Sequence, residues 1–121
     1  MKYSILIYQP DAYFNAAPDD ELWGAWRAYH KSLSDAGVYV DSGALKRPAT
    51  ATTVRVQGER RLVQYGPFAE TKEQLAGFIV VETPSLKEAL DWAARCPAAQ
   101  YGAVEVRPVQ EIEQFVPVFS S

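Results

Sequence analysis

Residues 77–97 read GFIVVETPSLKEALDWAARCP, and this stretch decides the fold. Its first five residues are apolar, and four of them are β-branched or aromatic, which is typical of a buried strand. Ser85 and Glu88 then form a capping-box pattern, in which the Ser85 hydroxyl accepts from the Glu88 amide while Glu88 reaches back. Pro97 ends a helix whose apolar face consists of Leu86, Ala89, Leu90 and Ala93. Residues 103–109 alternate apolar and polar side chains, so the whole predicts a β-α-β unit.

The N-terminal third predicts a second unit of the same kind. Residues 3–8 are rich in β-branched and aromatic side chains and predict a strand that is covered on both sides. Pro18 and the three acidic residues behind it mark a helix start, and Gly37 supplies a left-handed stop. We therefore expect a helix over 18–36 and a short, interrupted strand from 38–40 onward. The apolar stripe of that helix consists of Leu22, Trp26, Tyr29, Leu33 and Ala36.

A β-hairpin is predicted between the two units. Residues 50–56 and 61–64 have strand patterns, and Gln-Gly-Glu between them is turn chemistry. A polar connector with room for one helical turn follows over 68–74. Two β-α-β units with an inserted hairpin match an α+β fold of the ferredoxin-like, split β-α-β type. Right-handed crossovers place both helices on one sheet face, so we predict a homodimer that covers the other face, sheet against sheet.

The composition excludes several classes of function. The 121 residues carry 12 basic and 15 acidic side chains, without the basic patch that binding to nucleic acid requires. No apolar run approaches the ~20 residues of a membrane span. The single cysteine, Cys96, allows neither an intramolecular disulfide nor a zinc site. No phosphate-binding or dinucleotide motif occurs, so we expect no metal and no cofactor.

The organisation of the chain is predicted to be simple. We expect one domain over 1–109 and a C-terminal extension over 110–121, with one helical turn around Ile112 and Phe115. The N-terminal residues lead into a strand and not into the long apolar stretch of a signal peptide. We therefore expect a cytoplasmic protein.

Four segments resemble the DGPF branch of the YCII-related domain family. They are PATATTVR at 48–55, GPFAETKEQL at 66–75, AARCP at 93–97 and GAVEVRP at 102–108. The likeness covers nearly the whole chain, and the segment at 66–75 is long enough to be specific. The resemblance implies a ferredoxin-like domain that forms a dimeric α+β barrel. It also implies a small bacterial protein, and some members of the family occur beside or fused to extracytoplasmic-function sigma factors.

Three positions depart from the family pattern. The motif that names the branch begins with an aspartate, and Tyr65 stands in its place. A tyrosine is no carboxylate base at neutral pH. Members of the YCII branch proper are proposed to act through a histidine on the first helix and an aspartate after the second. Those positions fall on Trp26 and Cys96, so an enzymatic role that depends on that pair does not carry over.

His30 and Glu70 are the candidate catalytic residues. His30 is the only histidine and thus a natural proton-transfer group. It lies at the edge of the apolar stripe, where a packed or solvent-facing histidine is the more common case. Cys96 lies near the negative end of a helix dipole, which raises the pKa of a thiol and disfavours a nucleophilic thiolate.

Candidate ligand-binding residues gather in the hairpin and the connector. Arg55 can hold a carboxylate through two parallel hydrogen bonds, and Lys72 can bind an anion. The full predicted set is Arg55, Tyr65, Phe68, Glu70, Thr71 and Lys72. The same residue types are what a solvated loop and strand face need, so both interpretations stay open.

Two functions from different classes follow from these observations. In the first, the chain binds a small molecule and carries out proton-transfer or elimination chemistry without a cofactor. An anion is one form that this small molecule can take. In the second, it is a non-catalytic interaction or regulatory module that accompanies a sigma factor or another enzyme. The sequence leaves open whether the chain is an enzyme.

Overall fold

The computed structural model describes residues 1–17 and 19–110. Strands and helices alternate along this part of the chain, with an additional hairpin in the middle. In chain order the elements are β1 (Lys2–Pro10), α1 (Asp11–Asn15), α2 (Asp20–Asp35), β2 (Tyr39–Ala44), the 3-10 turn η1 (Pro48–Thr50), β3 (Thr52–Gln57), β4 (Arg60–Tyr65), β5 (Glu73–Glu82), α3 (Leu86–Arg95), α4 (Ala98–Tyr101) and β6 (Ala103–Pro108).

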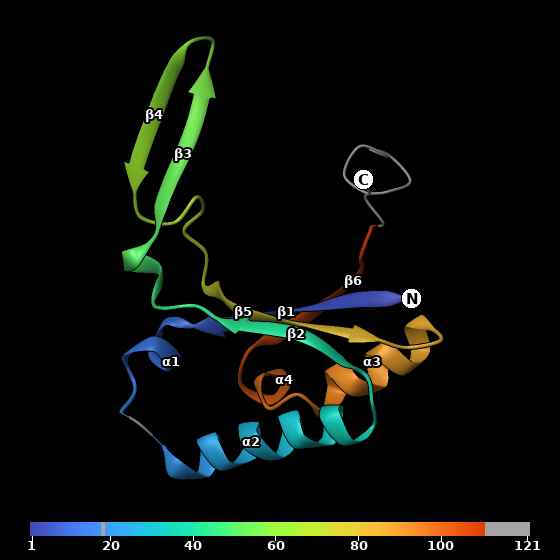
Figure 1. Cartoon of the computed structure of the whole chain (residues 1–121). Coiled ribbons are helices and arrows are strands. Elements are labelled where there is room, and N and C mark those ends of the chain that lie inside the picture. The colour runs from blue at the N-terminus through green and yellow to red at the C-terminus, as the bar shows by residue number, and fades with distance from the viewer. Residues whose placement is uncertain (18, 111–121) are drawn as a thin grey trace.

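Four of the strands form one antiparallel sheet in the order β2-β5-β1-β6, and β3 and β4 pair only with each other. The segment with α2 connects β1 to β2, and the segment with α3 and α4 connects β5 to β6. This interleaving of two β-α-β units confirms the predicted ferredoxin-like fold. Figure 1 shows all four α-helices on one side of the sheet, as predicted for right-handed crossovers.

The core lies between the helices and the sheet face that they cover. The strand register places Ile5 of β1 opposite Ile79 of β5 on this face. The Tyr29 hydroxyl donates to the carbonyl oxygen of Trp92 at 2.8 Å, which joins α2 to α3. The buried apolar side chains are Tyr3, Ile5, Ile7, Tyr29, Leu33, Ala76, Ile79, Val81, Ala89, Ala93, Cys96 and Ala98.

The expectation that the first strand is covered on both sides is wrong for the single chain. β1 is a central strand, but only its odd-numbered side chains from Tyr3 to Gln9 are buried. Leu6 and Tyr8 point to the opposite face, which no described helix covers, and they are half-buried. A strand that is apolar on both faces is therefore consistent with a second layer that another molecule supplies.

Helix α2 begins at Asp20 and not at residue 18. Asp19 is its N-cap, and Oδ1 of Asp19 accepts from the amides of Glu21 at 2.9 Å and Leu22 at 3.2 Å. Gly37 follows the helix with φ +71°, so the predicted left-handed stop is confirmed.

Helix α3 has the predicted cap, because the Ser85 hydroxyl accepts from the Glu88 amide at 3.4 Å. No return bond from the Glu88 side chain occurs among the described residues. Two helices of five and four residues, α1 and α4, were not predicted, because so short a helix leaves no periodic pattern.

Strand β5 starts at Glu73, so the last two residues of the connector predicted over 68–74 belong to the strand. No helical turn forms between Phe68 and Lys72 in the structure, which shows bends and irregular chain there. The reason is long-range pairing: Glu73 and Gln74 lie opposite Pro10 and Gln9 of β1, which the local sequence does not reveal.

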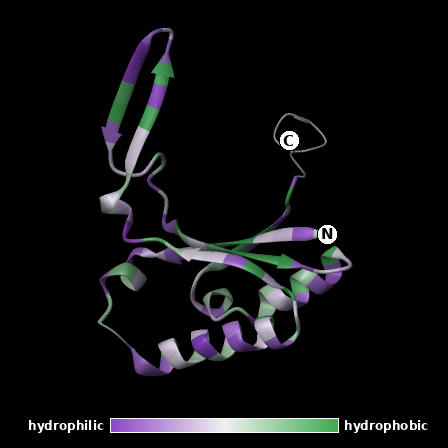
Figure 2. Cartoon of the chain, viewed as in Figure 1, coloured by the Kyte–Doolittle hydropathy of each residue, from purple (hydrophilic) through white to green (hydrophobic). Residues whose placement is uncertain are grey.

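Strands β3 and β4 form a hairpin that projects away from the sheet on the side opposite the helices (Figure 1). We call residues 52–65 the arm. Val54 lies opposite Val63, and direct partners of an antiparallel pair share a face. Hydrophobic and hydrophilic residues alternate along both strands (Figure 2), and the register gives one mostly apolar face, which consists of Thr52, Val54, Val56, Arg61, Val63 and Tyr65. The other face is mostly polar and consists of Thr53, Arg55, Gln57, Arg60, Leu62 and Gln64.

The sheet face that the helices leave uncovered, here called the open face, has an apolar centre. Leu6, Tyr8, Phe78 and Val80 are half-buried there, and Leu75 is exposed. The Phe78 ring lies across Gly43 of β2, where an added Cβ would come within 2.8 Å of the ring. The arm rises on this same side of the sheet (Figure 1).

None of the described helices is long and apolar enough to cross a bilayer. The predicted boundary between 109 and 110 stays a prediction. The predicted helical turn around Ile112 and Phe115 lies outside the described residues.

Candidate functional site

Two cavities flank α2 on the helix-covered side of the sheet. One lies between α2 and strands β2 and β5, and we call it the aromatic cavity. The other lies between α2 and the segment that contains α4, and we call it the polar cavity. Tyr13 of α1 lines both. Helix α2 thus separates two spaces of different chemistry.

The aromatic cavity has a volume of about 380 Å³. Its walls are Trp23 and Trp26 of α2, and small residues of the sheet form its floor, among them Ser42, Ala76 and Gly77. An added Cβ on Gly77 would come within 2.6 Å of the Gly43 carbonyl oxygen, so the floor cannot accept a larger side chain without moving β2. Large side chains on the helix and small ones on the strands leave the space open.

His30 lines the aromatic cavity and is half-buried. Its imidazole centre lies 6.3 Å from the ring of Trp26 and 5.9 Å from the ring of Tyr39, so aromatic side chains hold its orientation. Within the described part of the chain, no side chain or backbone group forms a hydrogen bond with its ring nitrogens. His30 is therefore a positioned imidazole whose nitrogens remain available to a bound molecule.

Cationic side chains stand around the aromatic cavity. Arg27 lines the cavity itself. An adjoining space of about 530 Å³, which shares Trp23 and Trp26 as walls, is lined by Lys46 and Arg47 from the segment after β2 and by one carboxylate, that of Asp19. Three cations close to an apolar space favour a ligand with negative charge at its edge.

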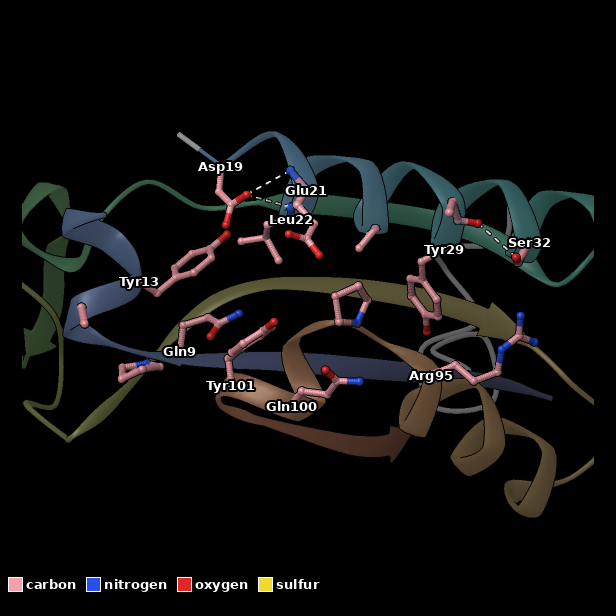
Figure 3. Close-up of a pocket in the computed structure, with 15 residues that line it drawn as sticks. Gln9, Tyr13, Asp19, Glu21, Leu22, Tyr29, Ser32, Arg95, Gln100 and Tyr101 are labelled. Carbon is pink, nitrogen blue, oxygen red and sulfur yellow. Dashed lines mark hydrogen bonds between the residues drawn. The ribbon is translucent and has the colours of Figure 1, made fainter. Parts of the chain in front are cut away.

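The polar cavity has a volume of about 780 Å³ and is shown in Figure 3. The carboxylates of Asp19 and Glu21 lie on its α2 side, and Gln9 and Tyr101 lie across from them. Arg95 marks the opposite end, where its guanidinium lies 4.3 Å from the centre of the Trp92 ring. The cavity is thus acidic at one end and basic at the other.

The hydrogen bonds of the connector fix the base of the arm. The Gly66 amide donates to the Ala51 carbonyl at 2.7 Å, and the Thr53 hydroxyl donates to the Gly66 carbonyl at 2.9 Å. The Gln74 side-chain amide donates to the carbonyls of Ala69 and Thr71, each at 3.1 Å. The segment that resembles the family motif therefore holds the arm in a defined direction.

The predicted ligand-binding residues lie on the arm and its base. The Arg55 guanidinium lies 4.6 Å from the centre of the Phe68 ring, and the Thr71 hydroxyl donates to the Glu73 carbonyl. Tyr65, Glu70 and Lys72 are exposed. The three cavities described above include none of the six predicted residues in their linings, so the single chain does not bring that set to a cavity.

Of the two candidate catalytic residues, His30 lines a cavity and Glu70 does not. Sequence reasoning placed Trp26 on the apolar stripe of its helix, and it did not single out Gln9 or Arg27 as site residues. Gln9 carried a signal, because it continues the inward-facing series of the first strand at every second residue. A polar residue in such a series is a candidate for a site.

Burial changes the acidity of two groups near α3. It raises the pKa of the Cys96 thiol from 9.0 to about 11, although amides at the start of α4 act in the opposite direction. Burial also raises the pKa of Tyr29 well above its ordinary value. The raised thiol pKa agrees with the predicted direction, but its main cause is desolvation and not the helix dipole. A nucleophilic role for Cys96 is thus disfavoured.

The fold defines an α+β protein of the ferredoxin-like type, and the comparisons with known proteins agree with this fold. The chain belongs to the YCII-related domain family, whose model matches residues 1–113. It is 34% identical over 114 residues to uncharacterized protein R00369 of Rhizobium meliloti (strain 1021), which covers 90% of this chain and 92% of that protein.

A solved structure has the same fold. It is 5-chloro-2-hydroxyhydroquinone dehydrochlorinase (TftG) from Burkholderia phenoliruptrix AC1100, in complex with 2,5-dihydroxybenzoquinone. The TM-score is 0.54 at 15% identity, and the match covers 92% of this chain and 95% of that one. At this identity the likeness concerns the fold alone.

Proposed function

We propose that the chain binds a small planar organic molecule in the aromatic cavity and that His30 exchanges a proton with it. The observation that carries this proposal is the position of His30, whose imidazole faces an aromatic-walled space with both nitrogens free of partners in the described chain. A volume of about 380 Å³ is within the range of small-molecule sites and suits a single-ring compound.

The walls and the charges narrow the class of ligand. Indole rings such as those of Trp23 and Trp26 favour a flat, conjugated molecule. Arg27 in the cavity and Lys46 and Arg47 beside it favour an anionic oxygen on that molecule. The structural neighbour was solved with 2,5-dihydroxybenzoquinone, a molecule of this class, which supports a ring with acidic hydroxyl groups.

His30 is suited to an elimination without a cofactor. One imidazole nitrogen takes a proton from the substrate, and the electron pair of the broken bond forms the new double bond. The leaving group departs with its bonding electrons as an anion, toward the surrounding cations, and the imidazolium then gives its proton to water. Acid–base catalysis of this kind contributes about 10²–10⁴-fold to a rate. No carboxylate orients His30 among the described residues, so we expect the lower part of that range.

Binding is tested with 2,5-dihydroxybenzoquinone and tryptophan fluorescence. Trp92 lies on α3 and lines neither the aromatic cavity nor its neighbour, so it separates cavity binding from contact elsewhere. The Trp92→Phe variant should keep the saturable quenching of the native chain. The Trp23→Phe, Trp26→Phe double variant, which retains only Trp92, should lose it. Quenching that persists in the double variant and disappears in Trp92→Phe would place the ligand elsewhere.

The proton-transfer role is tested separately, with chloride release from 5-chloro-2-hydroxyhydroquinone. His30→Gln should reduce the rate of chloride release about 10²-fold, while the affinity for 2,5-dihydroxybenzoquinone, measured by quenching, changes by less than about threefold. Release that is unaffected in His30→Gln would remove His30 from the mechanism and leave the cavity as a binding site.

We also infer that two copies of the chain associate through the open face and the arm. The arm carries three arginines and one glutamate, a net charge of +2, and the remainder of the chain carries −5. The basic arm of one copy is thus complementary to the acidic body of another, which favours a contact between copies. A two-stranded hairpin is also marginally stable by itself and gains from a second layer.

The exposed area agrees with a contact between copies. Val54, Val56, Val63 and Tyr65 share one face and are 55%, 69%, 46% and 87% exposed. Together they leave on the order of 450 Å² uncovered, and a standard interface buries ~800 Å² per partner. The arm therefore provides about half of the required surface, and the open face is available for the remainder.

The predicted ligand-binding residues on the arm and connector stay part of this proposal. Because Arg55, Phe68 and Lys72 lie at or near the base of the arm, they would reach a ligand only where two copies meet. In that case Lys72→Met, which removes a positive charge, weakens binding of 2,5-dihydroxybenzoquinone to the dimer, and Glu70→Gln, which removes a negative charge, strengthens it. Unchanged binding in both variants would assign these residues to the support of the arm alone.

The second candidate function is a non-catalytic interaction module, such as an accessory to an extracytoplasmic-function sigma factor. The exposed apolar face of the arm favours it, because such a face is also suited to a different protein. A chain that stays monomeric and releases no chloride would favour this alternative. The cytoplasmic location expected from the sequence stays a prediction.

A further inference from the structure

The polar cavity contains a buried amide that lacks a partner. Gln9 is 2% exposed, and its Oε1 atom has no hydrogen-bond partner among the described residues. The oxygen packs against Gly102, where an added Cβ would come within 3.1 Å of it. Figure 3 shows the nitrogen of the same amide directed into the cavity. A buried amide oxygen without a partner is costly, and no described residue accepts a hydrogen bond from the amide nitrogen, so the retention of Gln9 needs a reason other than stability.

The groups around Gln9 at this end of the cavity attract positive charge. Asp19 and Glu21 present carboxylates to the cavity from the start of α2 (Figure 3). Only Oδ1 of Asp19 is used by the helix cap, which leaves its second oxygen available. The ring of Tyr13 lies beside Asp19, and that of Tyr101 lies across the cavity next to Gln9, so both provide faces for a cation. The nearest cation among the lining residues, Arg95, stands at the opposite end over Trp92.

We propose that the polar cavity binds a small organic cation that carries a neighbouring hydrogen-bond acceptor, such as an amine with a carbonyl or hydroxyl group. The ammonium lies between Glu21 and Asp19, against the tyrosine rings. The acceptor oxygen takes the hydrogen bond of the Gln9 amide nitrogen. This site is separate from the aromatic cavity and does not depend on the function proposed for it.

The stability of a Gln9 variant tests whether the amide is kept for a ligand. Gln9→Met preserves the length of the side chain and removes the unpaired oxygen together with the amide nitrogen, so the melting temperature without ligand should rise by about 3–6 °C. Gln100→Met makes the same change at an exposed glutamine of the same cavity and should leave the melting temperature unchanged. A fall in the melting temperature of Gln9→Met would show that a water molecule satisfies the amide, and it would overturn the proposal.

Three matched fragments test the ligand class. β-Alaninamide has an ammonium and a carbonyl, propylamine has only the ammonium, and propionamide has only the carbonyl. Nitrogen–proton NMR spectra report on the side-chain amide of Gln9. β-Alaninamide should shift this signal at millimolar concentration with an affinity about tenfold above that of propylamine, and propionamide should leave it unchanged.

Two variants then assign the contacts. Glu21→Gln should weaken both cationic fragments about tenfold, because it removes one negative charge from the site. Gln9→Met should abolish the advantage of β-alaninamide over propylamine and leave the affinity of propylamine as it was. Equal affinities of all three fragments for the native chain, or no shift of the Gln9 signal up to about 50 mM β-alaninamide, would overturn the proposal.

Discussion

Replacement of Val56 by lysine tests whether the arm joins two copies of the chain. Val56 lies on the apolar face of the arm and is 69% exposed in the single chain. This leaves roughly 100 Å² of mostly apolar surface, which at ~25 cal/mol per Å² contributes about 2.5 kcal/mol when a partner covers it. A symmetric dimer has two such arms, so the change costs about 5 kcal/mol and raises the dimer dissociation constant by roughly three to four orders of magnitude.

The neighbouring position provides the control. Gln57 is also exposed and lies on β3 directly after Val56, but it belongs to the polar face of the arm. Gln57→Lys introduces the same charge and should leave association unchanged. An added lysine increases the charge complementarity between the arm and the acidic body, so weaker association in Val56→Lys must come from the lost apolar contact.

Sedimentation and light scattering over a range of concentrations measure the effect. The native chain should have about twice the 13.5 kDa mass of one chain at micromolar concentration. Val56→Lys should be a monomer there, with an unchanged circular dichroism spectrum, and Gln57→Lys should be a dimer. If Val56→Lys and the native chain dissociate at the same concentration, the arm does not bind a second copy.

Three further changes test the packing of a single chain. Trp26→Asp places a charge where a half-buried ring packs on the core, so it should lower the free energy of unfolding by about 2–4 kcal/mol. An unchanged midpoint of urea unfolding would contradict the conclusion that this face of α2 packs on the core. Gly77→Ala places a Cβ within 2.6 Å of the Gly43 carbonyl oxygen and should lower the free energy of unfolding by about 1–3 kcal/mol in the same assay. The control is Gly58→Ala, where φ is +61° and no atom lies near an added Cβ, so it measures backbone strain without a clash. The native Cys96 thiol stays protonated while that of the unfolded chain ionises, so stability should fall between pH 9 and about pH 11, by up to roughly 2.5 kcal/mol. Cys96→Ala should remove that part of the pH dependence, and an identical slope in both chains would contradict the burial of the thiol.

Local patterns were sufficient for the main elements of the fold. The stop at Gly37 and the cap at Ser85 were predictable, because each depends on residues within one helical turn. The order of strands and helices then predicted the ferredoxin-like arrangement, since few topologies satisfy two crossovers and one insertion. The start of β5 was not predictable, because Glu73 becomes part of a strand only through its pairing with Pro10.

The candidate site was only partly accessible from the sequence. His30 was singled out as the only histidine, yet a lone residue does not reveal that its imidazole faces a cavity. The connector was singled out for its polar side chains, and the structure shows Gln74 holding its carbonyls in place. The same residue types serve a ligand or a turn, and only their contacts distinguish the two uses.

Local sequence patterns were enough to predict the main strands and helices, the family, and a first strand that is apolar on both faces. The tertiary structure decided where the empty space lies. A cavity forms where large side chains of α2 meet small residues of β2 and β5, and these segments are far apart in the chain. Helix and strand periodicities act between near neighbours, whereas the gap between two packed elements depends on the sizes of residues that no local pattern relates.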